Sequence, residues 1–195
     1  MKESFTLSDW LSVLKGGKKI YYFSELLRVS RLSIPALHRA IQRMRQKKIL
    51  FKLGKGLFAN FFATPRLEEV TGYLYPPCYV SLEFALFMHG IMDQAPHVLT
   101  CVTTNKTKRF NTDLGEIHYA HIKKELFFGY GIEDRVPLAA PEKAALDFVY
   151  IQRQNGFQPA LDEWNWENMD YRKIKAFWMA YPQSVKKYMQ KFIVK

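Results

Sequence analysis

Long basic and amide side chains recur at helical spacing between residues 33 and 47. At about 100° per residue they share one side of a predicted helix, which Ser33 can cap. Arg can form paired hydrogen bonds with guanine and Gln with adenine, so such side chains could read bases in the major groove of DNA. The candidate DNA-contacting residues of this helix are Ser33, Ala36, Arg39, Gln42, Arg43, Gln46 and Lys47.

The other side of this helix is predicted to be buried. We expect the helix to run to about Lys48, with Pro35 in its first turn. Its apolar stripe consists of Ile34, Leu37, Ile41 and Met44. Taken alone, a basic amphipathic helix is as often only a solvated face of a protein. The neighbouring elements therefore decide between these two interpretations.

Two strand-like segments, residues 49–53 and 57–62, follow the helix and are joined by the sequence Gly-Lys-Gly, which is typical of a hairpin turn. Lys52 and Lys55 would lie near the end of this hairpin, where they could contact DNA phosphates. The predicted hairpin therefore directly follows the predicted basic helix.

Two shorter helices are expected upstream, at residues 9–15 capped by Ser8 and at residues 25–29 capped by Ser24. Three helices followed by a hairpin predict a winged helix-turn-helix. This fold binds DNA in many proteins and serves as a protein-docking module in others.

The positive charge of the chain is concentrated at its N-terminal end. The first 64 residues contain 13 Lys or Arg and 3 Asp or Glu, a net charge of +10, whereas the other residues contain 16 and 15, a net charge of +1. Because the basic segment is also rich in apolar residues, we expect a folded module for a polyanion. The predicted domains are a winged helix-turn-helix that binds double-stranded DNA (1–64), a linker (65–77) that could include an adapting helix, and a larger α/β domain (78–195).

The larger part of the chain alternates strand-like and helix-like segments, which predicts an α+β protein with a small mixed sheet flanked by helices. Strands are expected at residues 78–80, 98–104, 116–122 and 136–139. Helices are expected at residues 82–89 after Ser81, and at 142–150, 171–179 and 183–193.

The reactive residues of this part form no recognisable catalytic set. His118 and His121 would point to opposite faces of a predicted strand, so they cannot bind one metal ion together. Lys143 and Asp147 are four residues apart on a predicted helix, where they would give that helix ordinary support. The sequence has no GxSxG, HExxH or Walker motif. We therefore expect no enzymatic activity, no cofactor and no bound metal.

A second cluster of positive charge lies at residues 105–115, a predicted polar loop between two strands. Its cationic residues are Lys106, Lys108 and Arg109. As the solvated end of a hairpin, this loop needs no function. Alternatively, it makes a second phosphate contact or binds an acidic partner.

The sequence also limits where the protein acts. No segment is apolar over the roughly 18 residues that a membrane helix needs, and residues 1–19 lack the apolar stretch of a signal peptide. Cys78 and Cys101 lie far apart in apolar surroundings, which favours reduced thiols in a core. We expect a cytoplasmic protein with no membrane partner.

Several short elements occur in a characteristic order between residues 79 and 150. They are Ser81, Glu83 and Ala85 before His89-Gly90, then Thr103-Thr104 before Lys108-Arg109, then Phe127-Phe128-Gly129, and finally Pro141-Glu142-Lys143 before Asp147. In this order and spacing, the segment resembles the AbiEi family of bacterial antitoxins, which are also transcriptional regulators.

The resemblance implies a type IV toxin–antitoxin system in which the protein represses its own promoter region and neutralises an AbiEii-like nucleotidyltransferase toxin, directly or functionally. It also implies an N-terminal winged helix for repression and a C-terminal antitoxin domain. Two alternatives stay open: a nucleic-acid-processing enzyme whose winged helix positions the substrate, and a protein-docking adaptor.

Overall fold

The computed structural model describes residues 5–193, which form a mixture of α-helices and β-strands. They divide into two compact units. Unit 1 contains the residues up to Val70 together with Phe110–Gly115, and unit 2 contains Thr71–Arg109 and the residues from Glu116 onward. Over the described part of the chain, no helix combines the length and the apolar character that crossing a membrane requires.

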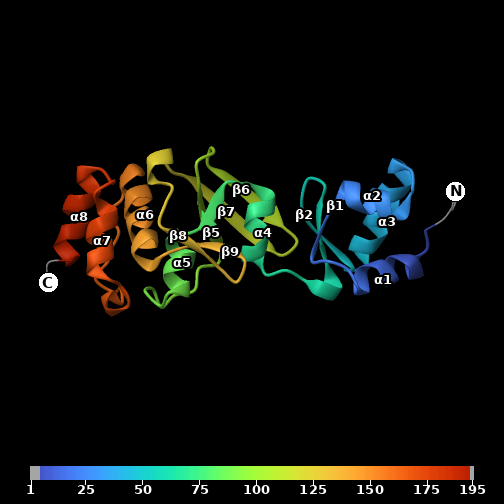
Figure 1. Ribbon diagram of the computed structural model, residues 1–195, viewed down its shortest axis with the longest axis horizontal. Helices are drawn as coiled ribbons and strands as arrows, with labels where there is room; N and C mark the ends of the chain where they lie inside the picture. Colours follow the sequence, from blue (N-terminus) through green and yellow to red (C-terminus); the bar gives the residue numbers. More distant parts are fainter. Residues whose placement is uncertain (1–4, 194–195) are drawn as a thin grey trace. The chain divides into compact units, whose positions relative to one another are not determined.

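Up to residue 63, unit 1 consists of helices and a three-stranded antiparallel sheet in the order β1-β3-β2 (Figure 1). Its elements are α1 (Leu7–Lys15), β1 (Ile20–Tyr22), α2 (Phe23–Ser30), α3 (Ile34–Gln46), β2 (Leu50–Gly54), β3 (Leu57–Asn60) and the 3-10 turn Phe61–Ala63. The predicted hairpin is confirmed as β2–β3, with its turn at Lys55 and Gly56. Strand β1 escaped prediction because three residues are too few to show an alternating pattern.

The first two helices begin earlier than predicted. Thr6 caps α1 in place of Ser8, because the Thr6 hydroxyl accepts the N–H of Asp9 at 3.3 Å while the Asp9 carboxylate accepts the N–H of Thr6 at 2.9 Å. The start of α2 is not capped by Ser24. Strand β1 leads directly into α2, and Glu25 accepts the last N–H of that strand at 2.8 Å.

The core of unit 1 lies between its helices and its sheet. Its buried hydrophobic residues are Trp10, Leu14, Tyr21, Leu26, Leu37, Ala40, Ile41, Met44, Leu50 and Phe58. The buried amide of Asn60 donates to the backbone oxygens of Leu14 at 2.7 Å and Lys18 at 3.1 Å. Leu14 lies in the last turn of α1, and its carbonyl also accepts the N–H of Gly17 at 3.2 Å. The Asn60 amide therefore adds a second bond to this carbonyl and fixes α1 to β3.

Unit 2 contains most of a six-stranded mixed sheet in the order β6-β7-β5-β4-β9-β8 (Figure 1). The pairs β4–β9 and β5–β7 are parallel, and β4–β5 and β8–β9 are antiparallel. The strands are β4 (Cys78–Val80), β5 (Leu99–Thr103), β6 (Lys108–Thr112), β7 (Gly115–His121), β8 (Tyr130–Glu133) and β9 (Val136–Ala139). The further helices are α4 (Leu67–Leu74), α5 (Leu82–Met88), α6 (Pro141–Gln154), α7 (Tyr171–Trp178) and α8 (Gln183–Ile193), with 3-10 turns at Lys124–Leu126 and Trp166–Asn168.

Two strands correct the prediction. The predicted loop at 105–115 contains β6, and β8 lies where no strand was predicted. Both are edge strands, so their sequences, KRFNT and YGIE, need not bury every second residue and show no apolar alternation. Residues 67–74 of the predicted linker form helix α4, so the linker includes the helix that was considered there. Cys78 and Cys101 are buried free thiols, as predicted.

Helix α6 is the central helix of unit 2. All of its residues from Glu142 to Tyr150 are buried, and it packs against α5, α7 and α8. A helix buried around its whole circumference belongs to a core. Its charged side chains must therefore find partners inside the protein.

Candidate nucleic-acid interface

Helix α3 begins and packs largely as predicted. The Ser33 hydroxyl accepts the N–H of Ala36 at 3.4 Å, and Pro35 occupies the first turn. The buried residues are Leu37, Ala40, Ile41 and Met44. Ile34 does not join them, and its side chain is 55% exposed. With Ala40 included, the buried side is centred about 70° away from Ile34, which leaves that residue at its margin.

The polar side of α3 faces solvent. Ala36 is partly buried, and the long side chains on this side are exposed: Arg39, Gln42, Arg43, Gln46 and Lys47. None of these five side chains forms a hydrogen bond or an ion pair with a described residue. Their donors are therefore available to a ligand.

A hollow of about 800 Å³ lies between α3 and the β2–β3 hairpin, within unit 1. It brings together four of the predicted residues: Arg39 and Gln42 from α3, Lys52 from β2, and Lys55 from the turn. No Asp or Glu of the described chain lines it. Three of the predicted cations and one amide thus face a single space, which suits a polyanion that also carries hydrogen-bonding groups.

The other two predicted basic residues lie elsewhere. Arg43 and Lys47 line a separate hollow of about 270 Å³, together with Thr6 and Trp10. The predicted set is therefore divided between two sides of α3. Arg39 and Gln42 share their hollow with the hairpin, and Arg43 and Lys47 share theirs with the start of α1.

Two residues that the sequence analysis missed also line the larger hollow. His38 and Arg45 are seven residues apart on α3, and this spacing, two helical turns, could have indicated that they share a side. Arg45 forms an ion pair with Asp113 at 3.1 Å, and Asp113 also accepts the N–H of Lys52 at 2.6 Å; all three belong to unit 1. Asp113 offsets part of the positive charge here, and no local sequence signal indicates this pairing.

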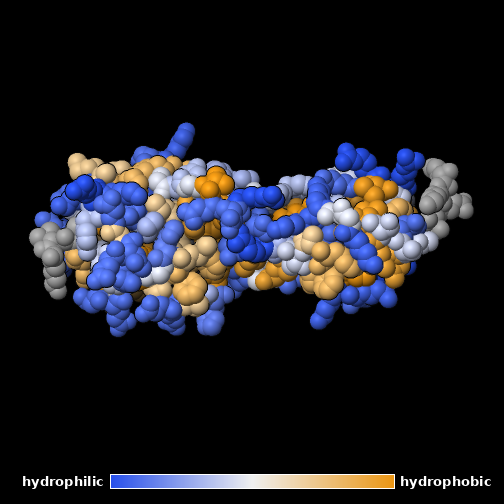
Figure 2. Space-filling model, turned by 60° about the horizontal axis from the view of Figure 1, so that its bottom comes forward, coloured by the Kyte–Doolittle hydropathy of each residue, from blue (hydrophilic) through white to orange (hydrophobic). Residues whose placement is uncertain are grey.

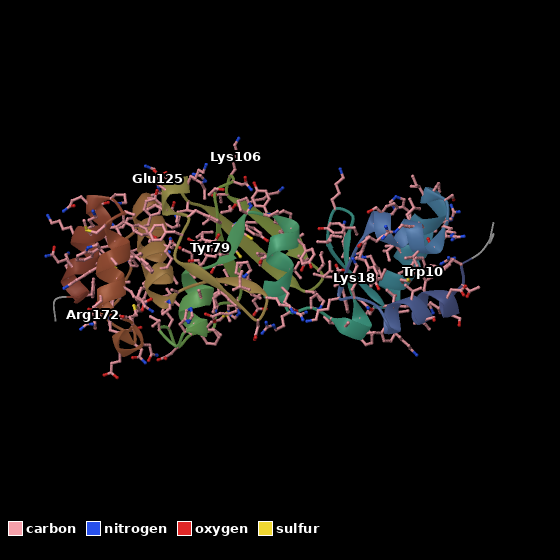
Figure 3. The ribbon with its side chains drawn as sticks, in the orientation of Figure 1. Trp10, Lys18, Tyr79, Lys106, Glu125 and Arg172 are labelled. Atoms are coloured by element: carbon pink, nitrogen blue, oxygen red, sulfur yellow. The ribbon has the colours of Figure 1, made fainter. Side chains whose placement is uncertain are left out.

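The second predicted cluster does not form one contact surface. Lys106 lies in the connection between β5 and β6, and its side chain points outward (Figure 3). Lys108 and Arg109 lie on β6, where consecutive side chains point to opposite faces. The ammonium group of Lys108 lies 5.1 Å from the centre of the Tyr75 ring. Lys108 and Arg109 therefore cannot hold one phosphate group together.

A buried polar network in unit 2 surrounds Asp147. Its carboxylate accepts hydrogen bonds from Tyr79 at 3.0 Å, Ser81 at 2.9 Å and Tyr181 at 2.6 Å, and it forms an ion pair with Lys143. All five side chains are buried, and Tyr79 is seen inside the unit in Figure 3. The prediction of ordinary support within one helix is therefore corrected, because this pair joins α6 to β4 and to the segment before α8.

Burial determines the protonation of this network. It lowers the pKa of Lys143, an effect that the charge of Asp147 opposes. Burial, followed by the charge of Asp147, raises the pKa of Tyr79 and Tyr181. The ammonium group also lies 5.2 to 5.5 Å from the ring centres of Tyr79, Phe128 and Tyr181, whose faces stabilise a desolvated cation.

Ser81 is the residue before α5, as predicted, but its side chain makes no cap hydrogen bond and donates to Asp147. The two histidines of β7 have separate partners: His118 Nε2 lies 2.6 Å from Glu116 Oε1, and His121 Nδ1 lies 2.9 Å from the Asn105 oxygen. Among residues 5–193, no three His, Cys, Asp or Glu side chains gather as metal ligands.

In comparisons with known proteins, no protein-family model matches this chain and no curated protein matches it significantly.

Proposed function

We propose that unit 1 is a winged helix-turn-helix that binds double-stranded DNA, with α3 in the major groove and the β2–β3 hairpin at the phosphate backbone. The observation that carries this proposal is the hollow in which Arg39, Gln42, Lys52 and Lys55 face one space. A helix about 10–12 Å across fits a major groove about 12 Å wide. The net charge of +10 over residues 1–64 supports a polyanionic ligand.

The connection between α2 and α3 supports the same proposal. Arg31 follows α2 with a left-handed φ of 53°, which ends that helix, and α3 begins three residues later at Ile34. A short turn of this kind is the connection that a helix-turn-helix requires. In this arrangement α3 is the recognition helix, and its N-terminal half approaches the bases.

For the whole chain, the proposed function is that of a cytoplasmic autorepressor and antitoxin that neutralises an AbiEii-like nucleotidyltransferase toxin and has no enzymatic activity of its own. This part rests on the resemblance of residues 79–150 to the AbiEi family. One feature of unit 2 supports recognition over catalysis: its Lys143–Asp147 ion pair is enclosed in the core, where a substrate cannot reach it.

One observation favours a protein-docking role instead. Phe61 and Phe62 follow β3 and are 54% and 37% exposed. Figure 2 shows hydrophobic side chains at the surface of unit 1 among hydrophilic ones. Exposed aromatic residues are enriched at protein interfaces.

A two-readout assay tests the proposed function. The protein is expressed with the gene that neighbours its own, and growth is scored separately from the output of its promoter. Arg39→Ala with Arg43→Ala should release the promoter and leave protection intact, whereas the control Lys173→Ala with Lys175→Ala on α7 should change neither. Normal repression by the Arg39 and Arg43 variant would contradict the proposal. Repression lost only by Phe61→Ser with Phe62→Ser would favour docking.

A further inference from the structure

The structure also points to a phosphate-binding site in unit 2, which we propose independently of the DNA interface of unit 1. Two open hollows of about 290 Å³ and about 330 Å³ share Arg153 of α6 and Ser184 of α8. The other residues on which the proposal rests are Lys123, Tyr150, Gln154, Gln158, Lys187 and Lys191.

Positive charge gathers here without a carboxylate to balance it. Lys123, Arg153, Lys187 and Lys191 line the two hollows, and no Asp or Glu in the described part of the chain does so. None of the four cations forms an ion pair with a described residue. Adjacent cations repel one another unless an anion lies between them.

Two acidic residues act on the edge of this region. Burial raises the pKa of Tyr150, whose side chain lines one hollow, and the charges of Glu125 and then of Asp147 add to this effect. Asp147 is enclosed in the core of unit 2. Glu125 itself is exposed on the 3-10 turn Lys124–Leu126 (Figure 3) and lines neither hollow. It therefore leaves the four cations available to a ligand.

The surroundings of the Arg153 guanidinium group give further support to the proposal. Its Nε atom is buried and has no hydrogen-bond partner in the described structure. The group lies 5.5 Å from the centre of the Tyr188 ring, and the ammonium group of Lys191 lies 5.6 Å from the same ring. The Tyr188 hydroxyl donates to the backbone oxygen of Pro159, which fixes the ring. The fixed Tyr188 ring thus holds two of the four cations beside the second hollow, where one anion would offset both charges.

Helix α8 adds further donors. Ser184 lies in its first turn, which contains no acidic residue. The N–H groups of Val185 and Lys186 bond to the Pro182 oxygen. The earlier N–H groups, of Gln183 and Ser184, precede the helical hydrogen-bond pattern and favour an anion. A phosphate group offers several acceptor oxygens, which match a guanidinium fork, a hydroxyl and backbone N–H groups. The ligand is therefore a phosphate group, carried by a free nucleotide or by a nucleic-acid backbone.

Calorimetric titration of the full chain tests the site. Arg39→Ala and Arg43→Ala are introduced first, so that a failure of the proposed DNA interface cannot be mistaken for a failure of this site. The probes are sodium pyrophosphate, ATP and a short DNA duplex of random sequence. Binding of pyrophosphate and ATP would identify a free nucleotide as the source of the phosphate, and binding of the duplex alone would identify the backbone.

In this background, Arg153→Gln with Lys187→Gln should weaken binding at least about tenfold, since charge-assisted hydrogen bonds are lost. The matched control is Lys173→Gln with Lys175→Gln on α7, an equal change of charge at exposed residues that line neither hollow. If circular dichroism shows that the Arg153 variant misfolds, Lys187→Gln with Lys191→Gln, both at exposed positions, replaces it. No binding of any probe, or an equal loss in the control, would overturn the proposal.

Discussion

Lys143 and Asp147 form an ion pair one helical turn apart, and neither side chain is exposed to solvent. Asp147→Ala would leave the Lys143 ammonium group unpaired and would remove the acceptor of three hydroxyl groups. We expect it to lower the free energy of unfolding by about 3–5 kcal/mol. The double variant Lys143→Met with Asp147→Asn removes both charges and keeps a side-chain acceptor. It should therefore lower the free energy of unfolding by less than Asp147→Ala does. Urea denaturation measures both variants, and a double variant less stable than Asp147→Ala would contradict this account of the network.

Gly129 lies against the same lysine. Its φ is +73°, and a Cβ atom built on it would lie 3.1 Å from the Lys143 Cγ and Cδ atoms. Gly129→Ala should therefore destabilise the protein by about 1–3 kcal/mol, since backbone strain adds to the close contact. Gly131→Ala is the matched control, because its Cβ atom would meet nothing within 4 Å. Thermal unfolding compares the two, and equal melting temperatures would show that the close contact is absent.

The acid sensitivity of unit 1 should depend on Glu25. A hydrogen bond from Lys18, helped by the N–H of Tyr22, lowers the pKa of Glu25 from its ordinary value of 4.5. Because the pKa is lower in the folded state, the stabilisation is complete above about pH 4.5 and is lost as the pH falls through the folded-state value. The difference in unfolding free energy between the wild type and Glu25→Gln should therefore shrink on acidification. A difference that stays constant down to about pH 3 would refute the assignment.

The sequence predicted local features of the fold better than distant contacts. The cap of α3 at Ser33 was predictable because the residues that form it lie within one turn of the chain. The place of Ile34 at the margin of the buried side depended on Ala40, a small residue that a search for large apolar side chains passes over. Strand β6 was missed because a polar edge strand resembles a loop.

In the candidate site, too, contacts between neighbouring elements were predictable from the sequence and contacts between distant residues were not. The four predicted residues of the larger hollow come from α3 and from the hairpin that follows it, elements adjacent in the chain. By contrast, Asp147 meets Tyr79 and Tyr181 only through packing, and Arg45 meets Asp113 across 68 positions of the sequence. No periodicity indicates such contacts, because they depend on how separate elements pack.

Within the proposed DNA interface, substitutions of base-contacting and phosphate-contacting residues should have different effects on DNA binding. Arg39→Ala should cost about 1–3 kcal/mol of binding free energy on the preferred sequence and relax the choice of sequence, because a contact to a base edge is lost. Lys55→Ala should weaken specific and random duplexes alike. Competition binding with both duplexes measures the contrast. Equal losses for Arg39→Ala on the two duplexes would mean that α3 does not read bases.

The salt dependence of DNA binding tests the central proposal most directly. The full chain is titrated with a duplex from its own upstream region at several salt concentrations. We expect the logarithm of the affinity to fall linearly with the logarithm of the salt concentration, and Lys55→Ala to reduce the slope by about 0.9, the contribution of one phosphate contact. Lys173→Ala, on α7 and outside the proposed interface, should leave the slope unchanged. Binding without salt dependence, or a slope that Lys55→Ala does not change, would contradict a DNA interface formed by α3 and the β2–β3 hairpin.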